Sequence, residues 1–134
     1  MILRIEHLGI AVKDLESANA LFTKLLGSGP YKTESVASEK VSTSFFKTGE
    51  SKIELLEASD PGSAVAKFIE KRGEGIHHVA FEVDDIIQTM ADLKNKGFQL
   101  LSDVPMKGAD NKLICFIHPK SSSGVLVELC QEIR

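Results

Sequence analysis

The sequence has only two cysteines, Cys115 and Cys130, and neither lies next to a second cysteine or a cluster of cations. A disulfide framework and a catalytic thiolate are therefore not expected, and both residues are predicted to be buried thiols in a reducing compartment. No apolar run approaches the length that crosses a bilayer. A strand-like pattern starts within two residues of the first methionine. That leaves no room for a cleaved signal, so we expect a cytoplasmic protein.

A basic stripe is also absent. Sixteen lysines and arginines are scattered among 19 aspartates and glutamates, for a formal charge of −3. This balance excludes a protein that follows a nucleic-acid backbone. The 134 residues, 43% hydrophobic and 26% charged, are typical of one soluble domain with a packed core. We therefore expect a single domain, 1–134, with neither nucleic acid nor membrane as a partner.

What the sequence does contain is a divergent internal repeat. The segment HLGIAV at 7–12 returns as HVAFEV at 78–83, and its His, its Val and a following Asp are 71 residues apart in the two copies. Each copy is followed by a helical pattern that ends at a glycine, over 15–26 and over 86–96. The same landmarks recur in the same order, so the chain is predicted to consist of two related halves.

Each half ends in an apolar strand that carries one glutamate. Glu54 and Glu128 are 74 residues apart, which requires three extra residues in the loop 119–124. Each half thus runs strand, helix and then two or three antiparallel strands, with a further helix at 63–72 between the halves. The expected strands are 7–12, 41–47, 52–57, 78–83, 113–118 and 125–130, with a mobile loop at 102–111.

Strand alternation predicts which side chains meet. Large apolar residues alternate with His7 in its strand, so His7 points away from the helices, and the same parity applies to His78. Glu54 and Glu128 likewise oppose the apolar residues of their strands. We therefore expect two histidines and two glutamates on the non-helical face of one sheet.

This residue set has a chemical interpretation. Two imidazoles and two carboxylates suit a divalent transition metal with open positions for substrate, and two carboxylates also suit proton removal and return. Each residue taken singly is more often a satisfied or solvated polar group. Recurrence in both halves at matching parity favours the metal interpretation.

The loop HPKSSSG at 118–124 is a second candidate site. Its backbone amides and hydroxyls, with Lys120 and Ser121, suit a phosphate or carboxylate. A plain solvated turn is equally compatible with the sequence.

Four stretches carry a resemblance to a known family: HLGIAV at 7–12, IELLE at 53–57, GIHHVAFEVDDI at 75–86 and HPK followed by GVLVEL within 118–129. They resemble the methylmalonyl-CoA epimerases of the vicinal oxygen chelate superfamily, which also includes glyoxalase I and the bleomycin-resistance proteins. The resemblance implies an α+β fold in which two βαβββ modules form a curved mixed sheet around a metal, usually in a homodimer. The implied parts are module 1 at about 1–59, a linker helix at about 61–74 and module 2 at about 75–134.

The resemblance also implies an activity, that of a metal-dependent isomerase of propionate metabolism. Its substrate is an acyl-CoA, and it interconverts (2R)- and (2S)-methylmalonyl-CoA by α-proton removal and return through a metal-stabilised enolate. The family's metal ligands fall on His7, Glu54, His78 and Glu128. Glu128 and Glu54 are the expected acid/base pair, and Lys120 and Ser121 are expected beside the CoA arm. Co2+, Mn2+, Zn2+ and Ni2+ all suit such ligands, so the sequence does not name the ion.

The sequence differs from the family pattern at one position, and several alternative functions stay open. Some epimerases carry a glutamate, proposed as one acid/base, in the strand where this chain has VSTSF at 41–45, so that role passes to another residue here. A glyoxalase I-like lactoylglutathione lyase would use the same metal set. A drug-binding resistance protein would need no metal, and ring-cleaving dioxygenases generally need more modules.

Overall fold

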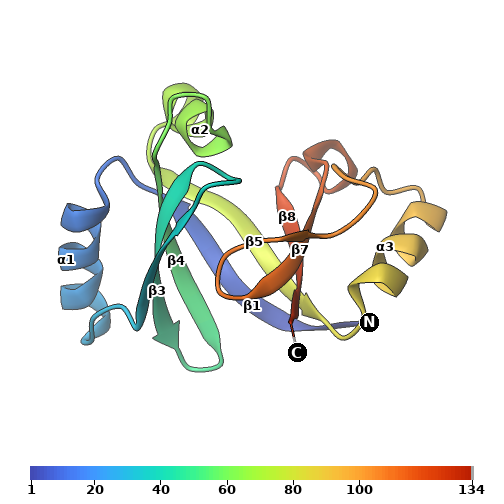
Figure 1. Ribbon diagram of the computed structural model, residues 1–134, viewed down its shortest axis with the longest axis horizontal. Coiled ribbons are helices and arrows are strands. Elements are labelled where there is room, and N and C mark those ends of the chain that lie inside the picture. Colours follow the sequence, from blue (N-terminus) through green and yellow to red (C-terminus); the bar gives the residue numbers. More distant parts are fainter. Residues whose placement is uncertain (134) are drawn as a thin grey trace. The chain divides into compact units, whose positions relative to one another are not determined.

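The computed structural model describes residues 1–133 (Figure 1). Its elements are β1 (Ile2–Ala11), α1 (Leu15–Leu26), β2 (Lys32–Val36), β3 (Val41–Thr48), β4 (Ser51–Ala58), α2 (Ala64–Arg72), β5 (Gly75–Val83), α3 (Ile86–Asn95), β6 (Met106–Lys107), β7 (Lys112–Ile117), the 3-10 helix η1 (Pro119–Ser121) and β8 (Val127–Glu132). The predicted α+β class is confirmed, because strand, helix and three strands occur twice, as β1-α1-β2-β3-β4 and as β5-α3-β6-β7-β8. Within residues 1–133, every helix is too short or too polar to span a bilayer.

The chain forms two compact units. The first unit is His7–His77, and the second is Met1–Glu6 together with the chain from His78 onward. Strands β1 and β5 each contribute residues to both units. His7 is therefore the first residue of the first unit, and His78 is where the chain returns to the second.

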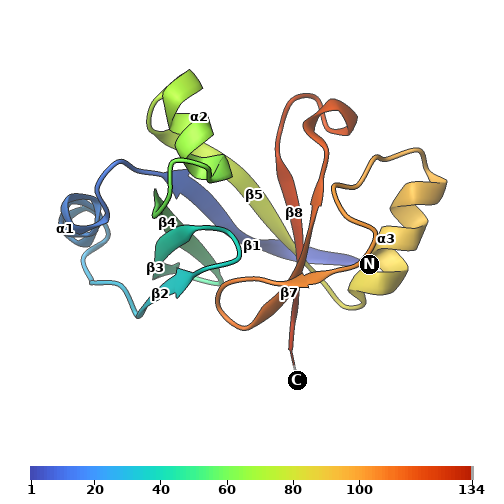
Figure 2. The same cartoon turned by 45° about the horizontal axis from the view of Figure 1, so that its top comes forward.

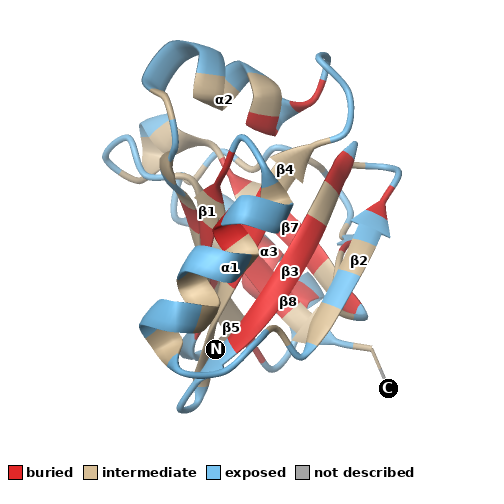
Figure 3. Cartoon of the chain, turned by 90° about the vertical axis from the view of Figure 1, so that its left-hand side faces the viewer, coloured by how far each residue is buried: buried red, intermediate tan, exposed pale blue. Residues whose placement is uncertain are grey.

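In the first unit the strand order is β2-β3-β4-β1. Strands β2, β3 and β4 pair antiparallel, whereas β1 pairs with β4 in parallel. Helix α1 covers one face, and Figure 3 shows its outer side largely exposed and β3 largely buried. The core under α1 consists of Val12, Ala18, Phe46 and Leu55. Figure 2 shows β2 next to β3 at the edge of this unit.

The ends of α1 agree with the sequence prediction. Asp14 is the N-cap, and its carboxylate accepts a hydrogen bond from the Ser17 backbone N–H at 3.1 Å. Hydrogen bonds from the side chain and backbone of Ser17 hold the pKa of Asp14 below its usual range. Gly27 ends the helix with a φ of 85°, a left-handed conformation that glycine adopts without strain.

In the second unit the strand order is β5-β8-β7-β6. Strand β5 pairs with β8 in parallel, and β8, β7 and β6 pair antiparallel. Helix α3, capped by Asp85, packs on a core that includes Val83, Ile86, Met90, Cys115, Ile117 and Leu129. The expected loop at 102–111 is only partly a loop, because Met106 and Lys107 pair with β7 as a short strand.

Candidate functional site

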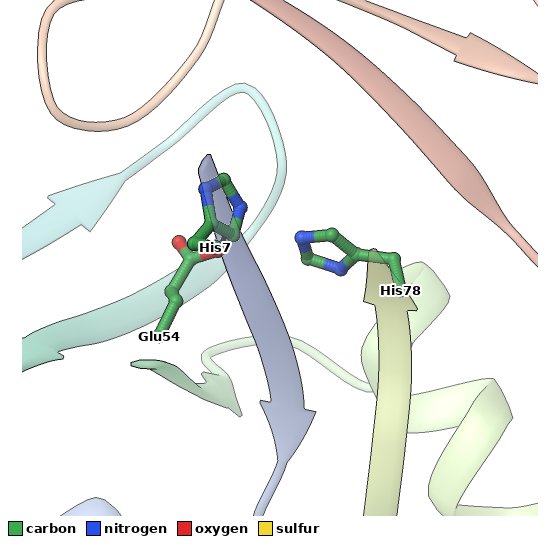
Figure 4. Close-up of side chains that lie close together, drawn as sticks. All are labelled: His7, Glu54 and His78. Atoms are coloured by element: carbon green, nitrogen blue, oxygen red, sulfur yellow. Dashed lines mark ion pairs between the residues drawn. The ribbon is translucent and has the colours of Figure 1, made fainter. Parts of the chain in front are cut away.

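The first unit holds a buried histidine–glutamate pair. His7 on β1 and Glu54 on β4 are each 4% exposed, and His7 Nε2 lies 3.2 Å from Glu54 Oε1 (Figure 4). The Phe45 ring meets the His7 ring edge-on, with centroids 6.4 Å apart and planes at 86°. Gly9 is the Cα partner of Glu54 and carries no side chain, so the face beside this carboxylate stays open.

The second unit repeats the arrangement. His78 on β5, also drawn in Figure 4, is 3% exposed, and Glu128 on β8 is 6% exposed. His78 Nε2 lies 3.3 Å from Glu128 Oε1, and the Phe116 ring meets the His78 ring edge-on at 5.9 Å and 88°. The Cα partner of Glu128 is Ala80, another small residue. The predicted parity therefore holds inside each unit, where it brings one histidine and one glutamate together.

The aromatic neighbours are residues that the sequence argument missed. Phe45 is the cross-strand partner of Glu54, and Phe116 is the cross-strand partner of Glu128. They are 71 residues apart, the same separation as His7 and His78, so the repeat itself contained the signal that would have found them. Each histidine is thus flanked by a carboxylate and a perpendicular ring that restricts its rotation.

Each pair fits a metal ion. Nitrogen and carboxylate oxygen ligands lie about 2.0–2.2 Å from ions such as Zn2+, which places neighbouring ligand atoms roughly 3 Å apart. The two Nε2–Oε1 separations, 3.2 and 3.3 Å, agree with that value. His7, Glu54 and His78 are buried and each can offer one ligand atom. A direct ion pair with a protonated histidine gives the same spacing, so metal analysis is needed to distinguish the two.

His77 behaves differently from its neighbour His78. Its ring packs edge-on against Phe68 of α2, with centroids 5.0 Å apart. The His77 ring therefore lies on the side of β5 that faces α2. This contact gives His77 a packing role.

A carboxylate lies beside β3, the strand in which some epimerases carry a glutamate and this chain has none. Thr43, on the same face of β3 as Phe45, is 1% exposed, and its Cα partner on β2 is Glu34. Glu34 therefore shares the face that carries His7 and Glu54. Its Oε1 lies 3.4 Å from Lys32 Nζ. The sequence argument missed Glu34 because it did not predict β2.

The loop at 118–124 is a tight turn whose amides are used internally. The N–H groups of Ser121, Ser122 and Gly124 donate to carbonyls within the turn. The Lys120 N–H donates to His118 Nδ1 at 3.1 Å, and Ser121 Oγ accepts from the Gln99 N–H at 2.9 Å. The exposed side chain of Lys120 is what this turn offers an anion. The three residues of η1 lie where the repeat required an insertion.

Both cysteines are free and fully buried, as predicted. Burial raises the pKa of the Cys115 thiol and, more strongly, that of Cys130, whose thiol also lies near the carboxylates of Glu128 and Glu6. Protonated, enclosed thiols are poor nucleophiles.

Comparison with known proteins identifies the family of this chain. The profile of the Glyoxalase/Bleomycin resistance protein/Dioxygenase superfamily matches residues 6–116. The chain is 41% identical to the ethylmalonyl-CoA/methylmalonyl-CoA epimerase of Cereibacter sphaeroides over 98% of this chain and 99% of that protein. It is 40% identical to the human mitochondrial methylmalonyl-CoA epimerase over 96% of this chain and 73% of that protein. A structure of Streptomyces coelicolor methylmalonyl-CoA epimerase in complex with 2-nitronate-propionyl-CoA is similar with a TM-score of 0.95 and 36% identity, over 98% of this chain and 96% of that one.

Proposed function

Since the chain belongs to the Glyoxalase/Bleomycin resistance protein/Dioxygenase superfamily, we propose that it is a metal-dependent epimerase that interconverts (2R)- and (2S)-methylmalonyl-CoA. The observation that carries the proposal is the buried His–Glu pair that recurs in each half with the same atoms at the same spacing. Identities of 40% and 41%, over 96% and 98% of this chain, to proteins named as epimerases of this substrate support it.

We infer that the two pairs share one divalent ion, with His7, Glu54, His78 and Glu128 as ligands. Imidazole and carboxylate ligands suit Co2+, Mn2+, Zn2+ or Ni2+. When bound, such an ion supplies the Lewis acidity that lowers the cost of negative charge on a thioester oxygen.

The glutamates are the proposed proton carriers. Inversion at the α-carbon requires a proton to leave one face and another to arrive on the opposite face. In this assignment a carboxylate oxygen of Glu128 takes the α-proton on one face, and the carboxyl group of Glu54 delivers a proton on the other. Burial of both side chains to 6% exposure or less limits exchange with bulk water during this transfer.

Proton NMR of methylmalonyl-CoA in heavy water tests the activity. We expect deuterium to enter the α-position with native protein and to stop entering after treatment with a chelator. Parallel samples with ethylmalonyl-CoA and with the glutathione hemithioacetal of methylglyoxal test substrate range. Conversion of the hemithioacetal without exchange in either acyl-CoA would mean that the glyoxalase alternative is correct.

Metal stoichiometry tests the shared site. We expect one ion for each chain in freshly purified protein, measured by elemental analysis. Two ions for each chain would assign a separate site to each His–Glu pair, and none would favour a binding protein without metal.

Three further features complete the proposal. Lys120 and Ser121 remain proposed contacts of the CoA arm, through the exposed lysine side chain.

A homodimer is proposed because Ile2, Leu3 and Ile5 of β1 are 46–50% exposed, and light scattering tests it. A reducing, cytoplasmic location is proposed from the two free thiols, and fractionation of the source cells tests it.

A further inference from the structure

Two lysines lie over the Tyr31 ring in the first unit, and a third is its neighbour in the chain. Lys47 Nζ lies 5.5 Å from the centroid of the Tyr31 ring, and Lys52 Nζ lies 6.0 Å from it. Lys32 follows Tyr31 in the chain and begins β2. We call Lys32, Lys47 and Lys52 the lysine cluster.

The lysine cluster shares a face with the His7–Glu54 pair. Lys52 is the Cα partner of His7 on β1 and of Lys47 on β3. Lys32 is the Cα partner of Phe45, which in turn is the partner of Glu54. Because cross-strand partners project from the same side of a sheet, all three lysines project on the side of the buried pair.

Aromatic rings connect the two groups. The Tyr31 ring lies 6.1 Å from that of Phe45, and the Phe45 ring lies 6.4 Å from that of His7. Tyr31 is 42% exposed, whereas His7 is 4% exposed. The row of rings thus runs from an exposed cationic rim to the buried candidate metal ligands.

The lysine cluster is unfavourable for stability by itself. Lys47 and Lys52 are direct cross-strand partners, and like charges in that position destabilise a sheet. Glu34 offsets part of the charge on Lys32, because its Oε1 lies 3.4 Å from Lys32 Nζ. Cation–π contact with Tyr31 holds two of the ammonium groups in place. Several ammonium groups held close together on one face are what a multiply charged anion requires.

We propose that the lysine cluster binds the phosphate groups of the acyl-CoA substrate, with Tyr31 as a positioning residue for Lys47 and Lys52. The inference rests on the proposed function and makes it more specific. CoA carries a pyrophosphate and a 3′-phosphate at the end of a long, flexible pantetheine arm. When the thioester lies near His7 and Glu54, the arm is long enough for the phosphates to reach the lysine cluster on the same sheet face. The turn at Lys120 and Ser121, proposed above as a contact of the CoA arm, is the competing location for the phosphate groups.

The decisive experiment compares two substrates, methylmalonyl-CoA and methylmalonyl-pantetheine, which lacks the phosphates. In the Lys47→Gln/Lys52→Gln double variant we expect KM for the CoA substrate to rise roughly tenfold or more, which is what loss of about 1.4 kcal/mol of binding produces. For the pantetheine substrate kcat and KM should equal those of the native protein. The melting temperature should match or exceed that of the native protein, because a like-charge pair has been removed.

One lysine variant serves as a control, and Lys120→Gln tests the competing location. Lys67→Gln, on the exposed side of α2, should leave KM for both substrates unchanged. An unchanged KM in the double variant, an equal loss with methylmalonyl-pantetheine, or a larger effect of Lys120→Gln would each overturn the proposal.

Calorimetric titration with CoA alone separates this proposal from the catalytic one. We expect CoA binding to weaken with added salt and to weaken further in the double variant, and we expect pantetheine not to bind. These results would support phosphate binding by the lysine cluster whether or not turnover occurs. Strong CoA binding with no isotope exchange in methylmalonyl-CoA would refute the epimerase and leave the phosphate site standing. Isotope exchange in methylmalonyl-CoA, together with CoA binding that is unchanged in the double variant, would refute the phosphate site and leave the epimerase standing.

Discussion

At the scale of single residues, the adjacent histidines of β5 give a direct test of the candidate metal site. His78→Ala removes a proposed ligand and should weaken metal binding by more than about a hundredfold, beyond what is typical of residues that only support ligands. His7→Ala should do the same. His77→Ala is the matched control, because His77 packs on Phe68 and should keep the full metal content. Elemental analysis after dialysis provides the measurement, and metal loss in His77→Ala would contradict the assigned strand faces.

The two glutamates are distinguished by what each substitution leaves intact. Glu128→Gln keeps a ligand oxygen but removes the base, so we expect α-proton exchange to fall roughly 10²–10⁴-fold while the metal is retained. Glu54→Gln should also retain metal and slow exchange. If metal and exchange disappear together in both variants, the glutamates are ligands only and the acid/base role belongs to another group. Glu34, the cross-strand partner of Thr43, is then the candidate.

The thiols predict an alkaline loss of stability. Burial raises the pKa of Cys130 above its usual value of 9.0, so the unfolded chain loses this proton at a lower pH than the folded chain. The stability that the protonated Cys130 thiol contributes is complete below the pKa of the thiol in the unfolded chain. It is lost as pH rises above that pKa, by about 1.4 kcal/mol for each pH unit. Urea unfolding at pH 7.5 and pH 10 should show a smaller drop for Cys130→Ala than for the native protein. An equal drop in both would refute this assignment.

At the scale of elements, sequence signals located helices better than edge strands. Helix α1 occupies Leu15–Leu26 as predicted, because Asp14 and Gly27 mark both ends. Strand β2, KTESV, was missed because it lies at a sheet edge and has no large apolar face. Strand β8 begins at Val127, two residues later than predicted, because the turn that contains η1 continues past Gly124. Lys32 is the member of the lysine cluster that lies on β2, so its place on the common face was not predictable once β2 was missed.

The attachment of α1 to β3 gives a prediction at the same scale. Phe46 is 1% exposed and its ring lies 6.3 Å from that of Phe22 on α1. Phe46→Ala should lower the free energy of unfolding by about 3–5 kcal/mol, because the cavity under the helix cannot close fully. Leu25→Ala, on the same helix but 71% exposed, should have an effect near zero. Urea denaturation measures both, and similar values for the two would contradict the assigned face of α1.

At the scale of the whole molecule, duplication explains why one sequence predicts so much of the site. The repeat fixes the parity of each histidine and glutamate, and parity fixes the face of the sheet. It does not fix the separation of side-chain atoms, because Nε2–Oε1 distances depend on rotamers that packing by Phe45 and Phe116 selects. The repeat does not determine the identity of the ion either, because several divalent metals accept the same ligands.

The single ion proposed above, with ligands from both halves, should also link metal binding to stability. Binding to the native state alone adds about 2.7 kcal/mol at a free metal concentration one hundred times Kd. For a chain of this size that corresponds to a rise in melting temperature of about 10 °C over the chelated protein. Because the ion requires both pairs, His7→Ala or His78→Ala alone should abolish the whole rise, while each variant unfolds near the temperature of the chelated native protein. Two independent sites would instead leave about half of the rise in each single variant, and differential scanning calorimetry across a metal titration separates the two outcomes.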